Sequence, residues 1–204
     1  MIRRLSVPRQ RGLAAVEFAL VLPLLMLLLF GMIDAARALQ ANIIIVNIGR
    51  EGANLVARGG TQLETGSQDI IYALMASAPP LNVQQRGMVY ITRVMGVTSG
   101  GVSRSVVVDQ YRWDDAARNL GYRANGYAPA SRIFACPAWS AGLCSGINSK
   151  NRPASAVMDG KLGDGEVVYV VETFYEFDMF MTSFAMDSLS LPTIGPDLYS
   201  MTVF

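Results

Sequence analysis

One carboxylate, Glu17, lies inside a long apolar run near the start of the chain. The basic residues Arg3, Arg4, Arg9 and Arg11 come before Gly12, and Glu17 is the only charged side chain from Leu13 to Ile33. An ionised acid inside a membrane-length segment costs about 2.5 to 3.5 kcal/mol near the centre and less near an end, so it needs a partner. If the chain is cut after Gly12, Leu13 gains an α-amine with a reference pKa of about 8, cationic at neutral pH. Glu17 can then pair with the new amine of a neighbouring copy. Such an ion pair would hold copies of the chain together in an assembly.

The apolar run is long enough to cross a bilayer. Its roughly 21 residues rise about 31 Å as a helix, close to the thickness of the hydrocarbon core. Because the arginines precede the run, the positive-inside rule keeps residues 1–12 in the cytoplasm and puts everything after about residue 34 outside. We therefore expect a leader at 1–12, a transmembrane segment at 13–34 and one extracytoplasmic domain at 35–204.

The order of basic leader, glycine, acid and apolar helix resembles that of type IV prepilins and pseudopilins. More narrowly, the N-terminus looks like the TadE-like family of the tight-adherence (Tad, or Flp) pilus system. The residues that carry this resemblance are Gly12 to Leu25, then Gly31, Asp34 and Arg37, and then Gly49 to Ala53. The resemblance covers about residues 12 to 58.

The resemblance implies a function in pilus assembly and no cofactor. The implied processing residues are Gly12, Leu13, Glu17 and Phe18, with a membrane prepilin peptidase cutting after Gly12. The implied assembly contacts are Leu13, Glu17 and Pro23. The expected protein is a minor pseudopilin, TadE or TadF, that acts in initiation, at the tip or in regulation of a Tad pilus used for adhesion. Its expected partners are other Tad pseudopilins, the major pilin, the inner-membrane assembly platform and membrane lipid. The expected location is the bacterial inner membrane, with one pass and a periplasmic C-terminal domain.

Two other interpretations of the N-terminus stay open. A basic segment and one apolar helix also serve as a plain anchor or as a cleaved secretory signal. The anchor interpretation corresponds to a single-pass periplasmic binding or adhesion module unrelated to filaments. A secretory signal has a shorter apolar core, and the residues after Gly31 fit its cleavage site poorly.

The residue pattern predicts an α+β fold, with a long pilin-like N-terminal helix packed on a small, mainly antiparallel sheet. Apolar spacing continues the helix from Leu13 to about Arg58, with a bend at Pro23. A second helix is expected from a capping box at Thr61–Glu64 to Pro79, with Ile70, Ile71, Leu74, Met75 and Ala78 on one face.

Segments rich in Val, Ile, Thr and Tyr predict strands at 88–97, 102–113 and 166–177, the first two forming a hairpin. Residues 114–165 are expected to be mainly a long loop, with a short helix near 114–120. The Met-rich segment 178–186 is expected in the core or at a subunit contact.

The two cysteines, Cys136 and Cys144, lie close together in that loop. In a periplasmic domain they suggest a disulfide, with two unpaired thiols as the alternative.

Catalysis is not expected. The chain has no histidine, so it lacks the usual general base and the common imidazole metal ligand. We expect a turn at Asp159–Glu166, because its acids miss the spacing of a calcium loop. Aromatic and arginine residues mix from Tyr111 to Tyr127, a mixture that could bind sugars or nucleic acid, but we favour positions in the core and in solvated loops for them. The 17 basic and 16 acidic side chains give no excess that favours nucleic acid.

Processing after Gly12 gives the first testable prediction. Mass spectrometry of the protein extracted from membranes should find a chain that starts at Leu13. An intact Met1 terminus in cells with an active prepilin peptidase would contradict it.

Overall fold

The computed structural model describes residues 11–58, 63–76, 78–180 and 197–204. They belong to two compact units. The first contains the chain up to Ala38 and the short segment Asp178–Phe180. The second contains Leu39–Phe177 and the C-terminal residues from Asp197. The predicted α+β class is confirmed, because a long apolar helix precedes a mainly antiparallel sheet.

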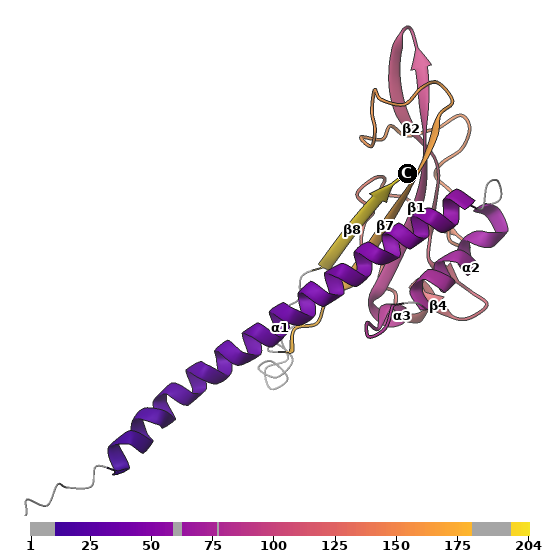
Figure 1. The fold of residues 1–204 in the computed structure, drawn as a ribbon. Helices are drawn as coiled ribbons and strands as arrows, with labels where there is room; N and C mark the ends of the chain where they lie inside the picture. Colours follow the sequence, from indigo (N-terminus) through magenta and orange to yellow (C-terminus); the bar gives the residue numbers. More distant parts are fainter. Residues whose placement is uncertain (1–10, 59–62, 77, 181–196) are drawn as a thin grey trace, which may run out of the picture. The chain divides into compact units, whose positions relative to one another are not determined.

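The N-terminal helix α1 spans Arg11–Arg58 without interruption (Figure 1). The predicted helix from Leu13 to Arg58 is therefore confirmed. Leucine, alanine and methionine, which favour helices, dominate its first half. Pro23 lies inside the helix without ending it, although its ring removes one backbone donor. The bend expected there stays a prediction.

The second unit is built on a six-stranded sheet in the order β5-β6-β2-β1-β7-β8, in which every neighbouring pair is antiparallel. Its long strands are β1 (Gly87–Ser99), β2 (Val102–Arg112), β7 (Val167–Glu176) and β8 (Asp197–Val203). The short strands β5 (Trp139–Ser140) and β6 (Leu143–Cys144) extend it beside β2. The three predicted strands and the hairpin are confirmed, the hairpin turning at Gly100–Gly101.

Helix α2 (Leu63–Ala76) confirms the second predicted helix, and the short helix α3 (Val83–Arg86) follows it. Ile71, Leu74 and Met75 are buried as expected from their spacing. Thr61 and Gln62, the start of the predicted capping box, lie outside the described residues.

In the second unit, one face of α1 packs on the sheet. Ala41, Ile45, Ile48 and Gly52 are buried at intervals of three and four residues, the repeat of a single helix face. A Cβ atom at Gly52 would lie 3.1 Å from Leu74 Cδ1 and 3.5 Å from Val171 Cγ1. A side chain at this position would therefore displace the end of the Leu74 side chain by a few tenths of an ångström. The absence of a side chain at Gly52 allows α1 to pack closely here.

The prediction for residues 114–165 was partly wrong. The stretch expected to be helical instead contains β3 (Asp114–Asp115), which pairs with β4 (Leu120–Gly121), and the helix α4 (Tyr122–Asn125) comes after it. The Asp115 carboxylate accepts hydrogen bonds from the backbone N–H groups of Ala117 and Arg118, both at 3.0 Å. This local bonding closes a turn and competes with helix formation.

Strand β8 was not predicted. It pairs with β7 from Asp197 to Val203 and forms an edge of the sheet. Of the segment 178–186, the structure describes only Asp178–Phe180, and the remainder lies outside the described residues.

The loop at residues 153–166 is fastened to the β1–β2 hairpin by backbone and carboxylate bonds. Asp159 accepts from Ser105 N at 2.9 Å, and Asp164 accepts from Thr98 N at 2.8 Å. Leu162 is buried against Val94, Val168 and Val170. The acids of the calcium-like sequence are thus bonded to backbone donors, in keeping with the expected turn before β7.

Gly96 in β1 has no room for a side chain under this loop, which gives the second testable prediction. Its Cβ would lie 2.2 Å from the Gly163 carbonyl oxygen, a backbone atom that cannot move aside cheaply. We expect Gly96→Ala to lower the free energy of unfolding by about 1 to 3 kcal/mol, the usual cost of overpacking. Urea unfolding of the detergent-solubilised full-length chain measures this change.

Gly163→Ala is the matched control for Gly96→Ala. Its Cβ would meet only the Glu166 side chain, at 3.4 Å and beyond, an ordinary contact. Equal unfolding midpoints for the two variants would contradict the packing described here.

Candidate functional site

The residues predicted to be processed lie at the start of α1. Gly12, Glu17 and Phe18 are exposed, and nothing comes within 4 Å of a Cβ placed on Gly12. Leu13 belongs to the same helix, and its side chain lies outside the described parts. The helical repeat places the acid one turn beyond Leu13.

A continuous apolar surface follows Glu17 along α1. Phe18, Leu20, Leu24, Leu28 and Met32 are among the large apolar side chains left exposed. Within the described ranges one helix, at Ala14–Gly52, is long and apolar enough to cross a membrane, with a mean hydropathy of 2.5. Exposure of this much apolar surface to water is strongly unfavourable, so lipid or other helices must cover it.

The apolar run ends at a buried acid that the sequence analysis did not single out for a contact. Asp34 accepts hydrogen bonds from Phe180 N at 2.8 Å and from Arg37 Nη1 at 3.3 Å. The partner Phe180 is 146 positions further along the chain, so local spacing could not reveal this contact.

In the second unit, the mixed aromatic and arginine residues form internal contacts. Trp113 and Tyr111 are buried. The Arg112 guanidinium lies 3.7 Å from the ring centre of Tyr122 and 5.0 Å from that of Trp139. These ring faces are occupied by an arginine of the same chain, which favours the core interpretation over a sugar or nucleic-acid site.

Glu172 on β7 is a second buried acid, with 0% of its surface exposed. It accepts hydrogen bonds from Arg132 N at 2.9 Å, from Tyr199 Oη at 3.0 Å and from Ser131 Oγ. Burial, and then the charge of Glu172, raises the pKa of the Tyr199 phenol, which therefore stays protonated and donates. Glu172 thus joins the loop at Ser131–Arg132 to strands β7 and β8.

Tyr90 on β1 holds the same loop at another point. Its hydroxyl donates to the Pro129 carbonyl at 2.7 Å. Burial raises the pKa of Tyr90 to about 12, opposed by the nearby Arg112 charge, so the donor persists at all physiological pH values. The loop is therefore fixed to the sheet by polar contacts that serve its structure.

The cysteines predicted to pair are joined in the structure. A disulfide links Cys136 to Cys144, with a Cα–Cα distance of 5.9 Å. It closes the segment that forms β5 and β6, where Trp139 lies opposite Cys144. Formation of this bond in the cell stays a prediction.

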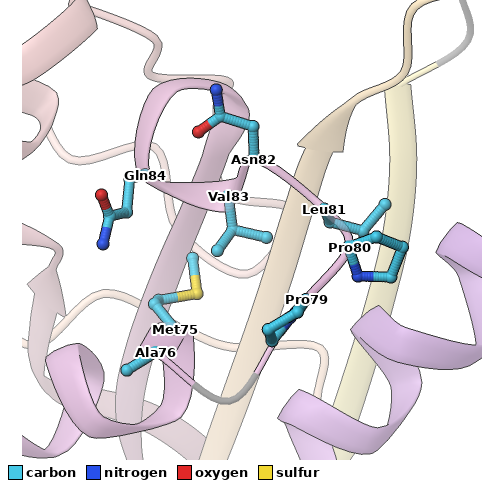
Figure 2. Close-up of a pocket in the computed structure, with 8 residues that line it drawn as sticks. All are labelled: Met75, Ala76, Pro79, Pro80, Leu81, Asn82, Val83 and Gln84. Atoms are coloured by element: carbon cyan, nitrogen blue, oxygen red, sulfur yellow. The ribbon is translucent and has the colours of Figure 1, made fainter.

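A shallow pocket lies between the end of α2 and α3 (Figure 2). Its lining consists of Met75, Ala76, Pro79, Pro80, Leu81, Asn82, Val83 and Gln84. These residues supply neither an acid nor a base nor a nucleophile. Nor do the described residues contain a group of three or more His, Cys, Asp or Glu side chains that could hold a metal ion.

Comparison with protein-family models supports the resemblance seen in the sequence. Residues 12–54 match the model described as TadE-like protein. The match begins at Gly12 and includes Glu17, the apolar run and the part of α1 that packs on the sheet. It confirms the predicted resemblance and indicates an association with the Tad pilus. Searches of curated proteins and of solved structures found no significant match.

The contacts of Glu172 give the third testable prediction. Glu172→Ala should lower the free energy of unfolding by about 3 to 5 kcal/mol, because the donors of Ser131, Arg132 and Tyr199 lose a charged acceptor in a buried place. Urea unfolding followed by tryptophan emission measures the change. Glu176→Ala, in the same strand but exposed, should stay within about 0.5 kcal/mol of the parent. A loss at position 176 as large as that at position 172 would contradict the assignment.

Proposed function

We propose that this protein is a minor pseudopilin, cut after Gly12 and used in the initiation, tip or regulation of a Tad-type pilus. It is held in the inner membrane by α1 before assembly, with its C-terminal domain in the periplasm. Its proposed partners are a prepilin peptidase, other Tad pseudopilins, the major pilin and the membrane assembly platform.

One observation carries the proposal: an exposed apolar helix has a single acid five residues after Gly12, within the TadE-like match. A plain anchor gains nothing from an ionisable group near the end of its span, since the group costs free energy in lipid. An assembling helix gains a specific contact, because the acid is stabilised only when a neighbour supplies a cation. Glu17 therefore favours assembly over anchoring.

The position of the bond between Gly12 and Leu13 suits cleavage. This bond lies in the first turn of the described part of α1, which starts at Arg11. The side chain-free Gly12 leaves open space around the bond.

We place the pairing between Glu17 and the amine of Leu13 between neighbouring subunits. In the cut chain, Leu13 and Glu17 occupy the first turn of one helix, and the amine there adds to the positive end of the helix dipole. A carboxylate of a neighbour shifted along the filament axis can satisfy this amine. Such a pair sets the register between adjacent helices, while the apolar surface provides most of the contact area.

Variants of Gly12 and Glu17 separate processing from assembly and give the fourth testable prediction. Gly12→Val should leave the leader uncut, because a branched side chain fills the space beside the bond. Glu17→Gln and Glu17→Ala should be cut normally but should reduce piliation, since each removes the negative charge. Immunoblots report the cut, and electron microscopy counts the pili.

Gly31→Val is the matched control, because Gly31 is also in α1 and is equally open. It should be cut and should support piliation. An uncut leader in the parent chain would instead favour a membrane-anchored binding module, and normal piliation in the Glu17 variants would remove the proposed pairing.

A further inference from the structure

The first unit contains a contact between α1 and the chain that follows β7. The Phe180 ring packs on the Phe30 ring with centroids 5.7 Å apart. Its backbone N–H donates to Asp34 Oδ1 at 2.8 Å. Two independent contacts thus place Phe180 beside one turn of α1.

This turn lies at the end of the apolar run. Ile33 is the last residue of the run, and Asp34 is the first acid after Glu17. Phe30 is about 6 Å closer to the middle of the span than Asp34, because four residues separate them along the helix. The ring that packs on Phe30 is therefore at a depth where α1 itself is apolar.

The acid at this level is shielded from its surroundings. Asp34 is only 7% exposed, and the Arg37 guanidinium pairs with it at 3.3 Å from one turn further out. The Arg37 side chain remains half exposed, as suits a cation at the level of lipid headgroups. Along α1, the apolar Phe30 therefore lies toward the middle of the span and the Arg37 cation lies toward its outer end. The same order, from apolar to cationic groups, is found at a membrane surface.

Phe180 itself remains 45% exposed, and its neighbours Asp178 and Met179 are half buried. Leu27 and Ile33, three residues before and after Phe30 and so on neighbouring positions of the same helix, also have exposed side chains. If α1 spans the membrane, lipid covers that surface, and the adjoining ring is covered with it.

We propose that Phe180 is a second point of membrane contact, inserted at the outer boundary between headgroups and acyl chains beside Phe30. An aromatic ring at this depth gains free energy by leaving water, while the Asp34 hydrogen bond satisfies the backbone donor that accompanies it. The contact fixes Phe180, shortly after β7, at the membrane surface before assembly. This inference rests on the membrane span in the proposed function, and the following experiment tests the two separately.

Quenching of tryptophan by brominated lipid tests the contact and is the fifth testable prediction. The full-length variant Phe180→Trp is reconstituted in phosphatidylcholine vesicles with or without bromine on the acyl chains. Wild-type protein, which has Trp113 and Trp139 in the second unit, supplies the baseline to subtract. The added emission should fall by roughly half in brominated vesicles, because a ring at the headgroup–acyl boundary lies within reach of the quencher.

Two control variants provide reference levels of quenching for comparison with Phe180→Trp. Leu24→Trp, within the apolar run, should be quenched at least as strongly as Phe180→Trp. Val102→Trp, at the exposed turn of the hairpin, should not be quenched. An unchanged urea midpoint verifies that Phe180→Trp folds as the parent does.

Quenching at 24 and 180 but not at 102 supports the inference. Quenching at 24 alone overturns it, leaves the span intact and indicates that water or another subunit covers Phe180. Absence of quenching at 24 overturns the membrane span and this inference with it.

Discussion

An acid without a cation of its own in the apolar run of α1 is the constraint on which the interpretation depends. Glu17 occurs in a helix surface that the described chain leaves uncovered, so both the charge and the apolar area require partners from outside. Lipid satisfies the area but penalises the charge, whereas a filament of similar helices satisfies both. In the proposed function, assembly is therefore favoured over storage in the membrane mainly by electrostatics, while van der Waals packing supplies affinity between the helices.

The same helix meets two different environments. From Phe18 to Ile33 its side chains are apolar in all directions, as expected for a segment surrounded by hydrocarbon. From Ala41 onward only one face is buried, and Gly52 allows that face to approach Leu74 and Val171 closely. Leu39 and Ile43 remain exposed on the same helix, so its apolar character extends beyond the contact with the sheet.

The sequence predicted those elements whose signals are local and strong. The helix from Leu13 to Arg58, α2 and the strands β1, β2 and β7 followed from apolar spacing and from β-branched residues. The turn at Asp115 was missed because its carboxylate bonds nearby N–H groups, an option that composition does not distinguish from helix formation. Strand β8 was missed because buried and exposed residues do not alternate regularly along it. Its partner β7 is also not adjacent to it in the sequence. The Asp34–Phe180 and Glu172–Ser131 contacts also join distant positions, and no spacing rule connects them.

The strand order has a consequence for how the domain forms during synthesis. β1 and β2 are consecutive and can close as a hairpin early, but β7 occupies the position between β1 and β8. Until β7 has been made, the backbone groups of β1 on that side lack their ladder partners, and an open strand edge of this kind invites pairing with other chains. During synthesis there is therefore an interval in which the hairpin of β1 and β2 is complete but one of its edges is unprotected. Crowding of nascent copies, rather than instability of the finished sheet, is the condition under which this architecture is most vulnerable to aggregation.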